Sequence, residues 1–148
     1  MTSTVITDNI IDVLLGDETD AYFVHQVNCK KVAGSGLAAQ FRKRVPRWFD
    51  TYKRTEAQLG DIGLFRVNDN VIVNLYGQDG FGYNRQYTDY EAVGKGLIQL
   101  SEMLEPGTKV YFPYKMGAGL GGGNWELIQS IIEAALQDQE IIYVRKQL

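Results

Sequence analysis

The chain has 148 residues, of which 45% are hydrophobic and 22% charged, and its net charge is −3. These values are typical of one globular domain with a buried core, and the mild acidity disfavours a general attraction to nucleic acid or to an anionic membrane. One cysteine and one histidine argue against a disulfide framework and a protein-only zinc site. We therefore expect a single domain over residues 1–148, cytoplasmic and monomeric, with no metal, no cofactor and no membrane partner.

The first part of the chain predicts a strand followed by a helix. Residues 21–27 are β-branched and aromatic, as expected for a buried strand. Leu37, Phe41 and Val45 share one helical face, and Pro46 ends that helix.

A second helix and a hairpin come next. Trp48, Tyr52 and Leu59 mark the apolar side of the helix. The strand-like runs at 63–67 and 71–76 are separated by a short polar turn, so they predict an antiparallel hairpin.

The second half alternates in the same way. Apolar runs at 109–113 and 141–144 predict central strands, and residues 90–104 and 125–135 carry apolar side chains at helical spacing. Helices interleaved with buried strands predict an α/β fold, a three-layer α/β/α sandwich with a central mixed, mostly parallel sheet.

Two glycine-bearing loops each lie between a predicted strand and a predicted helix, at 28–36 and 116–123. Bare backbone N–H groups beside a helix N-terminus form an anion site, usually for phosphate, and two such loops side by side suit a diphosphate. The alternative is that the glycines only form tight turns. Neither loop matches the P-loop or the Rossmann fingerprint, so an NTPase or a dehydrogenase has little support.

Three stretches resemble a macro domain, the α/β/α module that binds ADP-ribose. "VHQVNCKKVAGSGLAAQF" is similar to the family's first loop, where an Asn that ends a strand precedes a Gly-x-Gly-[IL]-Ala helix start. "FPYKMGAGLGGGNWELI" is similar to its phosphate loop, and "NLYGQDGFGYNRQYTDYEAV" to the segment between them. Within the family, "HQVNC" and "NWE" resemble the small ADP-ribosyl-glutamate hydrolases and the yeast-type ADP-ribose 1″-phosphate phosphatase.

The resemblance implies a role for each matching position. Asn28 would contact the distal ribose, while the two loops wrap the diphosphate. In many macro domains an Asp accepts from the adenine amino group; Asn9 stands there, with Ile10 beside the base and Asp8 as an alternative acceptor. The ligand-binding residues that the resemblance implies are Asp8, Asn9, Ile10, Asn28, Gly34, Ser35, Gly36, Leu37, Tyr83, Met116, Gly117, Ala118, Gly119, Leu120, Gly121 and Gly122.

The chain departs from the glutamyl hydrolases at two positions. Their Asp after the second glycine loop corresponds to Gly121, and their catalytic Lys corresponds to Tyr87. The resemblance therefore does not carry their covalent mechanism to this chain. His25, by contrast, matches a His of the phosphatase subgroup.

Catalysis without a metal needs positioned charge and a group that moves a proton. The candidates are His25 with Asp89 or Asp79, and Asn28 as the residue that positions a water. Two of them have a structural alternative: His25 as a hydrogen-bonded core residue, and Asp89 as a helix N-cap.

Two further groups of residues also have alternatives. Phe81, Tyr83 and Tyr87 are expected either to stack on the adenine or distal ribose or to cap the core. The basic residues between 42 and 54 lie at helical spacing, which favours a solvated face over general nucleic-acid binding.

We expect an ADP-ribose-binding macro domain that hydrolyses an ADP-ribose derivative, with ADP-ribose 1″-phosphate as the first candidate substrate. One alternative is a reader that binds or sequesters ADP-ribose without chemistry, which the missing Lys and Asp favour. The other is a hydrolase that removes ADP-ribose from modified protein or nucleic acid.

Overall fold

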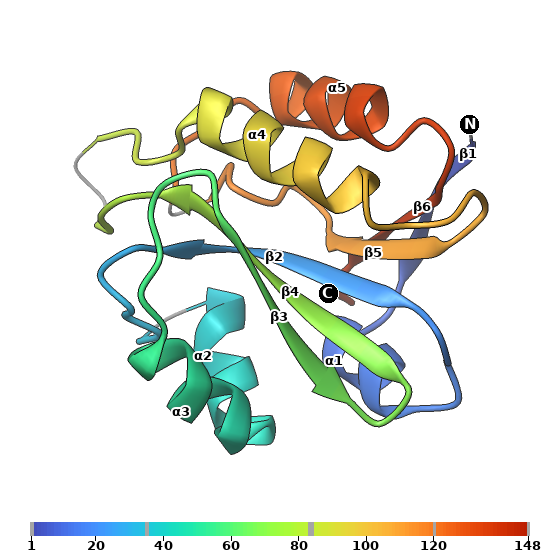
Figure 1. Ribbon diagram of the computed structural model, residues 1–148, viewed down its shortest axis with the longest axis horizontal. Helices are drawn as coiled ribbons and strands as arrows, with labels where there is room; N and C mark the ends of the chain where they lie inside the picture. Colours follow the sequence, from blue (N-terminus) through green and yellow to red (C-terminus); the bar gives the residue numbers. More distant parts are fainter. Residues whose placement is uncertain (1, 35, 83–84, 120, 148) are drawn as a thin grey trace.

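The structure, a computed structural model, describes residues 2–34, 36–82, 85–119 and 121–147. Strands and helices alternate along most of the chain (Figure 1). In chain order the described elements are β1 (Thr2–Thr7), α1 (Ile10–Leu15), β2 (Tyr22–Asn28), α2 (Gly36–Arg44), α3 (Pro46–Arg54), β3 (Ile62–Val67), β4 (Asn70–Gln78), α4 (Tyr90–Ser101), β5 (Lys109–Pro113), α5 (Trp125–Ala135) and β6 (Glu140–Arg145).

The strands form one sheet in the order β1-β6-β5-β2-β4-β3. Every neighbouring pair is parallel except β3 and β4, which form the predicted hairpin. Helices α4 and α5 cover one face of the sheet, and α1, α2 and α3 cover the other (Figure 1). The predicted three-layer α/β/α sandwich with a mixed, mostly parallel sheet is confirmed.

Alternate residues of β2 enter two separate cores. Phe23 and Val27 pack with α1, α2 and α3, whereas Val24 packs with α4 and α5. Because side chains alternate along a strand with a period of two, the polar residues of β2 also have defined faces. His25 shares the face of Phe23, and Gln26 lies on the face of Val24.

The structure contains two elements that the sequence did not predict, β1 and α1. The strand is short and rich in Thr and Ser, and its side chains from Ser3 to Thr7 are exposed. The helix has only six residues, too few to show a helical period. Helix α2 ends before Pro46, as predicted, and Pro46 then occupies the start of α3, where its missing N–H costs nothing.

Within the part of the chain that the structure describes, no helix is long and apolar enough to cross a bilayer.

Candidate functional site

A crevice opens at the carboxyl ends of β2 and β5, which are neighbours in the sheet. The two strands pair only through Tyr22 with Val110 and Phe23 with Tyr111, although β2 continues to Asn28. After β2 the chain passes to α2 on one face of the sheet, and after β5 it passes to α5 on the other (Figure 1). In open α/β sheets, ligands bind in the crevice between two neighbouring strands whose following helices lie on opposite faces of the sheet.

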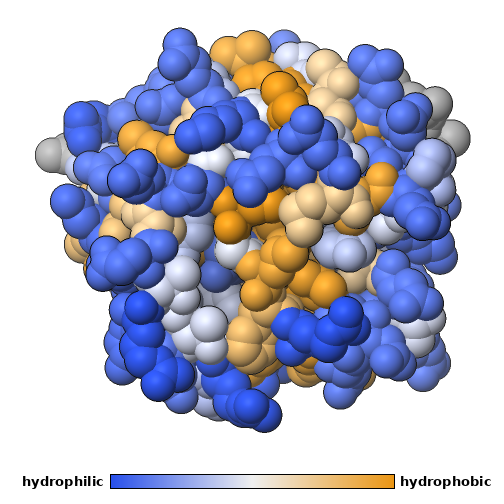
Figure 2. All heavy atoms as spheres, in the orientation of Figure 1, coloured by the Kyte–Doolittle hydropathy of each residue, from blue (hydrophilic) through white to orange (hydrophobic). Residues whose placement is uncertain are grey.

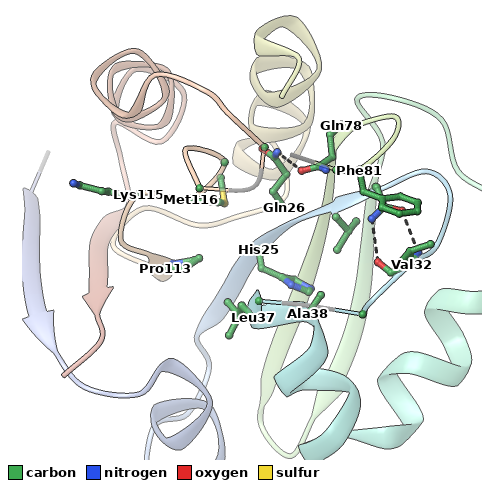
Figure 3. Close-up of a pocket in the computed structure, with 18 of the residues that line it drawn as sticks. His25, Gln26, Val32, Leu37, Ala38, Gln78, Phe81, Pro113, Lys115 and Met116 are labelled. Carbon is green, nitrogen blue, oxygen red and sulfur yellow. Dashed lines mark hydrogen bonds between the residues drawn. The ribbon is translucent and has the colours of Figure 1, made fainter. Parts of the chain in front are cut away.

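The crevice holds a cavity of about 360 Å³, a size typical of small-molecule sites. The β2–α2 loop forms one wall and the β5–α5 loop another, and Phe81 lies beside the first (Figure 3). Lys146 also lines the cavity. The predicted ligand-binding residues that line it are Asn28, Gly34, Gly36, Leu37, Met116, Gly117, Gly119 and Gly121. Ser35, Tyr83 and Leu120 lie outside the described residues.

The side chain of Asn28 closes the β2–α2 loop. Its amide nitrogen donates to the carbonyl oxygen of Val32 at 3.0 Å, and its amide oxygen accepts from the Val32 N–H at 3.1 Å. The hydroxyl of Tyr52 donates to the Asn28 carbonyl at 2.7 Å. An Asn amide has two N–H groups and two lone pairs, so Asn28 can hold the loop and still offer one N–H to a ligand.

The β5–α5 loop is shaped by glycines. Gly117 has a φ of 79° and accepts a hydrogen bond from the Gly123 N–H at 2.9 Å. At Gly121 a Cβ atom would meet the Thr88 hydroxyl and lie 2.7 Å from the Gly117 carbonyl, so only glycine fits. Gly119 is different, since a Cβ there would meet nothing within 4 Å. Among the described residues, the N–H groups of Gly119 and Gly121 donate to no backbone acceptor, and they are available to an anion.

A polar network holds this glycine loop against the sheet. Gln26 Nε2 donates to Gln78 Oε1 at 2.7 Å and to Thr88 Oγ1 at 2.9 Å. The Thr88 hydroxyl donates to the Gly117 carbonyl at 2.8 Å, and the Thr88 N–H donates to the Gly121 carbonyl at 3.0 Å. Strand β2, the β4–α4 loop and the glycine loop are therefore tied together on one side of the cavity.

The charged groups on the cavity wall are positive. Lys115 and Lys146 line it, and none of the described lining residues is Asp or Glu. The chain as a whole is acidic, with a net charge of −3, so this is a local property of the crevice. It favours an anionic ligand.

His25 lies in the floor of the crevice and is only 2% exposed. Its Nε2 is 2.8 Å from Asn74 Oδ1, which also accepts from the Trp48 indole N–H at 2.7 Å. Because an indole N–H can only donate, the shared atom is an oxygen and His25 Nε2 carries the proton. Burial lowers the pKa of His25 to about 4. At neutral pH the imidazole is uncharged and has the surroundings of a hydrogen-bonded core residue.

Asp89 does not line the cavity. It is the N-cap of α4, where its carboxylate accepts from the Ala92 N–H at 3.0 Å. This is the structural alternative that the sequence offered for Asp89.

The residues expected at the adenine lie at the start of α1. Asn9 is the N-cap of α1, and its side-chain oxygen accepts from the N–H groups of Ile11 and Asp12 at 2.9 and 3.2 Å. Asp8 Oδ1 accepts from the Asn9 N–H at 2.7 Å, and Ile10 is buried in the core. Neither these residues nor Ala118 and Gly122 line the cavity.

Asp79, another catalytic candidate, and the nearby thiol of Cys29 are poorly suited to acid, base or nucleophilic chemistry. Asp79 approaches Lys30 at 4.0 Å, and both side chains are 60% exposed. Burial raises the pKa of the Cys29 thiol, with Asp79 adding to the effect, so the reactive thiolate is disfavoured.

Several residues that line the cavity were not predicted from the sequence, among them Gln26, Gln78 and Lys146. Two signals could have found them. A glutamine within an otherwise apolar central strand is costly unless it has polar partners. Lys146 follows the last strand, and parallel strands end at the same edge of a sheet, so it belongs beside the end of β5.

The arrangement suits anion binding better than acid–base catalysis. Backbone N–H groups line the cavity together with Lys115 and Lys146, and the Lys115 side chain points away from its centre (Figure 3). The imidazole beneath it is neutral and has a pKa of about 4, far from the value at which a general acid or base works well at pH 7.

Comparison with known proteins finds relatives in sequence and in fold. No protein-family model matches the chain. It is 31% identical over 134 residues to an uncharacterised 17.5 kDa protein of the tk-vs intergenic region of Enterobacteria phage T4, which covers 81% of this chain and 83% of the phage protein. It is 29% identical over 133 residues to the DNA ADP-ribosyl glycohydrolase of Mycobacterium tuberculosis. That match covers 84% of this chain but only 37% of the mycobacterial protein.

Solved structures agree with the fold. The macrodomain of Thermus aquaticus DarG superposes with a TM-score of 0.74 at 22% identity, over 97% of each chain. Thermosipho africanus DarTG in complex with ADP-ribose gives a TM-score of 0.65 at 20% identity, over 86% of this chain and 38% of that one. The chain is therefore a macrodomain by its fold, and it belongs to one sequence family with the phage T4 protein.

Proposed function

We propose that the crevice binds ADP-ribose or a close derivative. The observation that carries this proposal is the pair of glycine-bearing loops on either side of a cavity with lysines and no described carboxylate. ADP-ribose has its diphosphate between two riboses, so its negative charge is central and its ends carry hydroxyls. The N–H groups of Gly119 and Gly121, which donate to no backbone acceptor among the described residues, suit the diphosphate. The remaining N–H of Asn28 suits a ribose hydroxyl. The complex of Thermosipho africanus DarTG with ADP-ribose supports this ligand.

The test is a calorimetric titration with ADP-ribose, comparing the wild type with Gly119→Glu and Gly119→Ala. Gly119 lines the cavity, and a Cβ atom there would meet nothing within 4 Å, so we expect the fold to tolerate both substitutions. We expect Gly119→Glu to abolish measurable binding, because its carboxylate would repel the diphosphate, and Gly119→Ala to retain most of the affinity. Unfolding midpoints near that of the wild type serve as the control. Equal affinity in wild type and Gly119→Glu would place the ligand elsewhere.

A second function, the release of ADP-ribose from modified DNA, is supported by the 29% identity to the mycobacterial DNA ADP-ribosyl glycohydrolase. On this chain the reaction would use the lysines and glycine N–H groups to stabilise negative charge and Asn28 to position a water. Hydrolysis of ADP-ribose 1″-phosphate has less support, because His25 is buried with a low pKa and Asp89 caps a helix.

One incubation series separates these possibilities. Purified protein is given ADP-ribosylated single-stranded DNA in one tube and ADP-ribose 1″-phosphate in another, with free ADP-ribose and free phosphate measured over time. Release of ADP-ribose that Asn28→Ala removes would support the glycohydrolase. Release of phosphate that His25→Gln removes would support the phosphatase. Tight binding of ADP-ribose without release of either product would support a reader.

A further inference from the structure

Positive charge is concentrated on two consecutive helices. Residues 36–54, which contain α2 and α3, hold six of the chain's 15 Lys and Arg residues but only one of its 18 Asp and Glu residues. This segment therefore carries a charge of +5. The rest of the chain, with nine basic and 17 acidic residues, carries −8. We call the six cations the basic α2–α3 surface, which consists of Arg42, Lys43, Arg44, Arg47, Lys53 and Arg54.

All six side chains are exposed, and most have no anionic partner. Within the described ranges, Arg44 is the one member with a carboxylate nearby, Asp12 at 2.6 Å. The charged groups of Arg42 and Lys53 lie 4.2 and 5.2 Å from the centre of the Phe49 ring. These contacts restrict the motion of the two side chains without neutralising their charge. Strongly hydrophilic side chains cover the lower left of the molecule, where α2 and α3 lie (Figures 1 and 2).

The helix dipole accounts for five of the six cations but not for Arg47. Cations in the last turn of a helix interact favourably with the helix dipole, and this explains those at the ends of α2 and α3. Arg47 lies in the first turn of α3, where the dipole disfavours a cation and where no acidic residue is present. The six cations also repel one another, which lowers the stability of the fold. Binding of a partner with the opposite charge would relieve this repulsion.

The basic α2–α3 surface adjoins the crevice. Leu37 lines the cavity from the first turn of α2, and Lys43 lies six residues further along, about 9 Å at 1.5 Å per residue. Lys31, in the β2–α2 loop, reaches Glu56 beyond the end of α3 at 3.6 Å. Lys31 is the neighbour of Val32, which lines the cavity, so the β2–α2 loop comes within ion-pair distance of the residue two positions beyond α3.

We propose that the basic α2–α3 surface binds the phosphodiester backbone of a nucleic acid strand. A strand offers regularly spaced negative charges and needs no apolar contact. The centre of a protein–protein interface is usually apolar, and a helix that lies in a membrane surface presents an apolar face as well as a basic one. The described exposed large hydrophobics include none between residues 36 and 54. A nucleic acid strand that carries an ADP-ribose group would occupy the basic α2–α3 surface and the crevice together. The placement of the ADP-ribose group in the crevice rests on the proposed function.

The test is fluorescence anisotropy of a labelled 20-nucleotide single-stranded DNA, titrated with the full chain at several salt concentrations. The surface variant is Lys43→Glu with Arg47→Glu, two exposed residues that make no described ion pair. The matched control is Arg66→Glu with Lys95→Glu, on β3 and α4. Both variants change the net charge from −3 to −7, so they differ only in where the charge is removed.

We expect the wild type to bind the oligonucleotide with an affinity that falls steeply with salt, with a logarithmic slope of about −3 if some four phosphates are contacted. The surface variant should lose at least tenfold in affinity, and the control variant should lose less than threefold. Both variants should keep the wild-type affinity for free ADP-ribose, so failure of this proposal is distinguishable from failure of the proposed function.

Three results would overturn the proposal: no oligonucleotide binding by the wild type at 20 mM salt, equal losses in the two variants, or binding to anionic lipid vesicles without binding to DNA.

Discussion

At the scale of single residues, the surroundings of His25 decide what it can do. Asn74 accepts hydrogen bonds from both His25 and Trp48, so the imidazole is held as one neutral tautomer. The ring of Phe41 lies 4.6 Å away, centre to centre. A proton on Nδ1 would place a buried charge among aromatic rings, and this burial is what lowers the pKa of His25 to about 4.

This burial predicts a loss of stability in acid. The folded pKa of about 4 lies below the ordinary value of 6.5, so the unfolded chain takes up the proton first as the pH falls. The stabilising effect is complete above pH 6.5 and is lost as the pH falls from 6.5 to 4, by roughly 3 kcal/mol. Urea unfolding at pH 7, 6, 5 and 4.5 should show this loss in the wild type.

The matched variant is His25→Gln, which keeps an N–H for Asn74 and does not titrate. His25 is the chain's single histidine, so the difference between the two pH profiles reports on this group alone. The wild type should lose more free energy of unfolding than the variant between pH 7 and 4.5. Parallel profiles would show that His25 is not buried as a neutral group.

At the scale of elements, the glycine loop depends on segments distant in sequence. Thr88 precedes α4 and lies 29 residues from Gly117, yet its hydroxyl donates to the Gly117 carbonyl and accepts from Gln26. Thr88 is therefore a positioning residue for the loop. Its side chain does not line the cavity, so it would act on a ligand through the loop alone.

Thr88→Val should weaken ADP-ribose binding, because the variant removes one of the two hydrogen bonds to the Gly117 carbonyl and one of the two made by the Gln26 amide nitrogen. The expected loss is about fivefold, corresponding to a hydrogen bond worth about 1 kcal/mol. Thr88→Ser keeps the hydroxyl and should restore the affinity. Calorimetry on both variants distinguishes this role from simple packing, in which Val, the closer match in volume, would be the milder change. Wild-type affinity in Thr88→Val would refute the positioning role.

The sequence predicted those elements whose signals are local. The hairpin was visible from its polar turn, and Pro46 marked the boundary between α2 and α3. The strand β1 and the helix α1 were missed because each has only six residues. The strand has no run of apolar residues, and the helix is too short to show apolar residues at helical spacing. The partners of His25 and Gln26 could not be predicted, since Asn74 and Thr88 are 49 and 62 residues away and only the folded sheet brings them together.

At the scale of the whole molecule, the layers and the mixed sheet followed from the alternation of strand and helix signals. The two glycine loops were expected side by side, and the separation of β2 and β5 beyond Phe23 provides the cavity between them. Net charge was less informative. The value of −3 is the sum of +5 on residues 36–54 and −8 on the rest of the chain. A sum of this kind conceals a basic surface.

The central claim is that the two glycine loops hold ADP-ribose, and amide chemical shifts of 15N-labelled protein during a titration with ADP-ribose test it most directly. We expect the largest changes at backbone amides of both loops, among them Gly34, Gly36, Gly117, Gly119 and Gly121. Changes confined to the opposite edge of the sheet, around Asp69 and Thr108, or no changes at millimolar ligand, would contradict it.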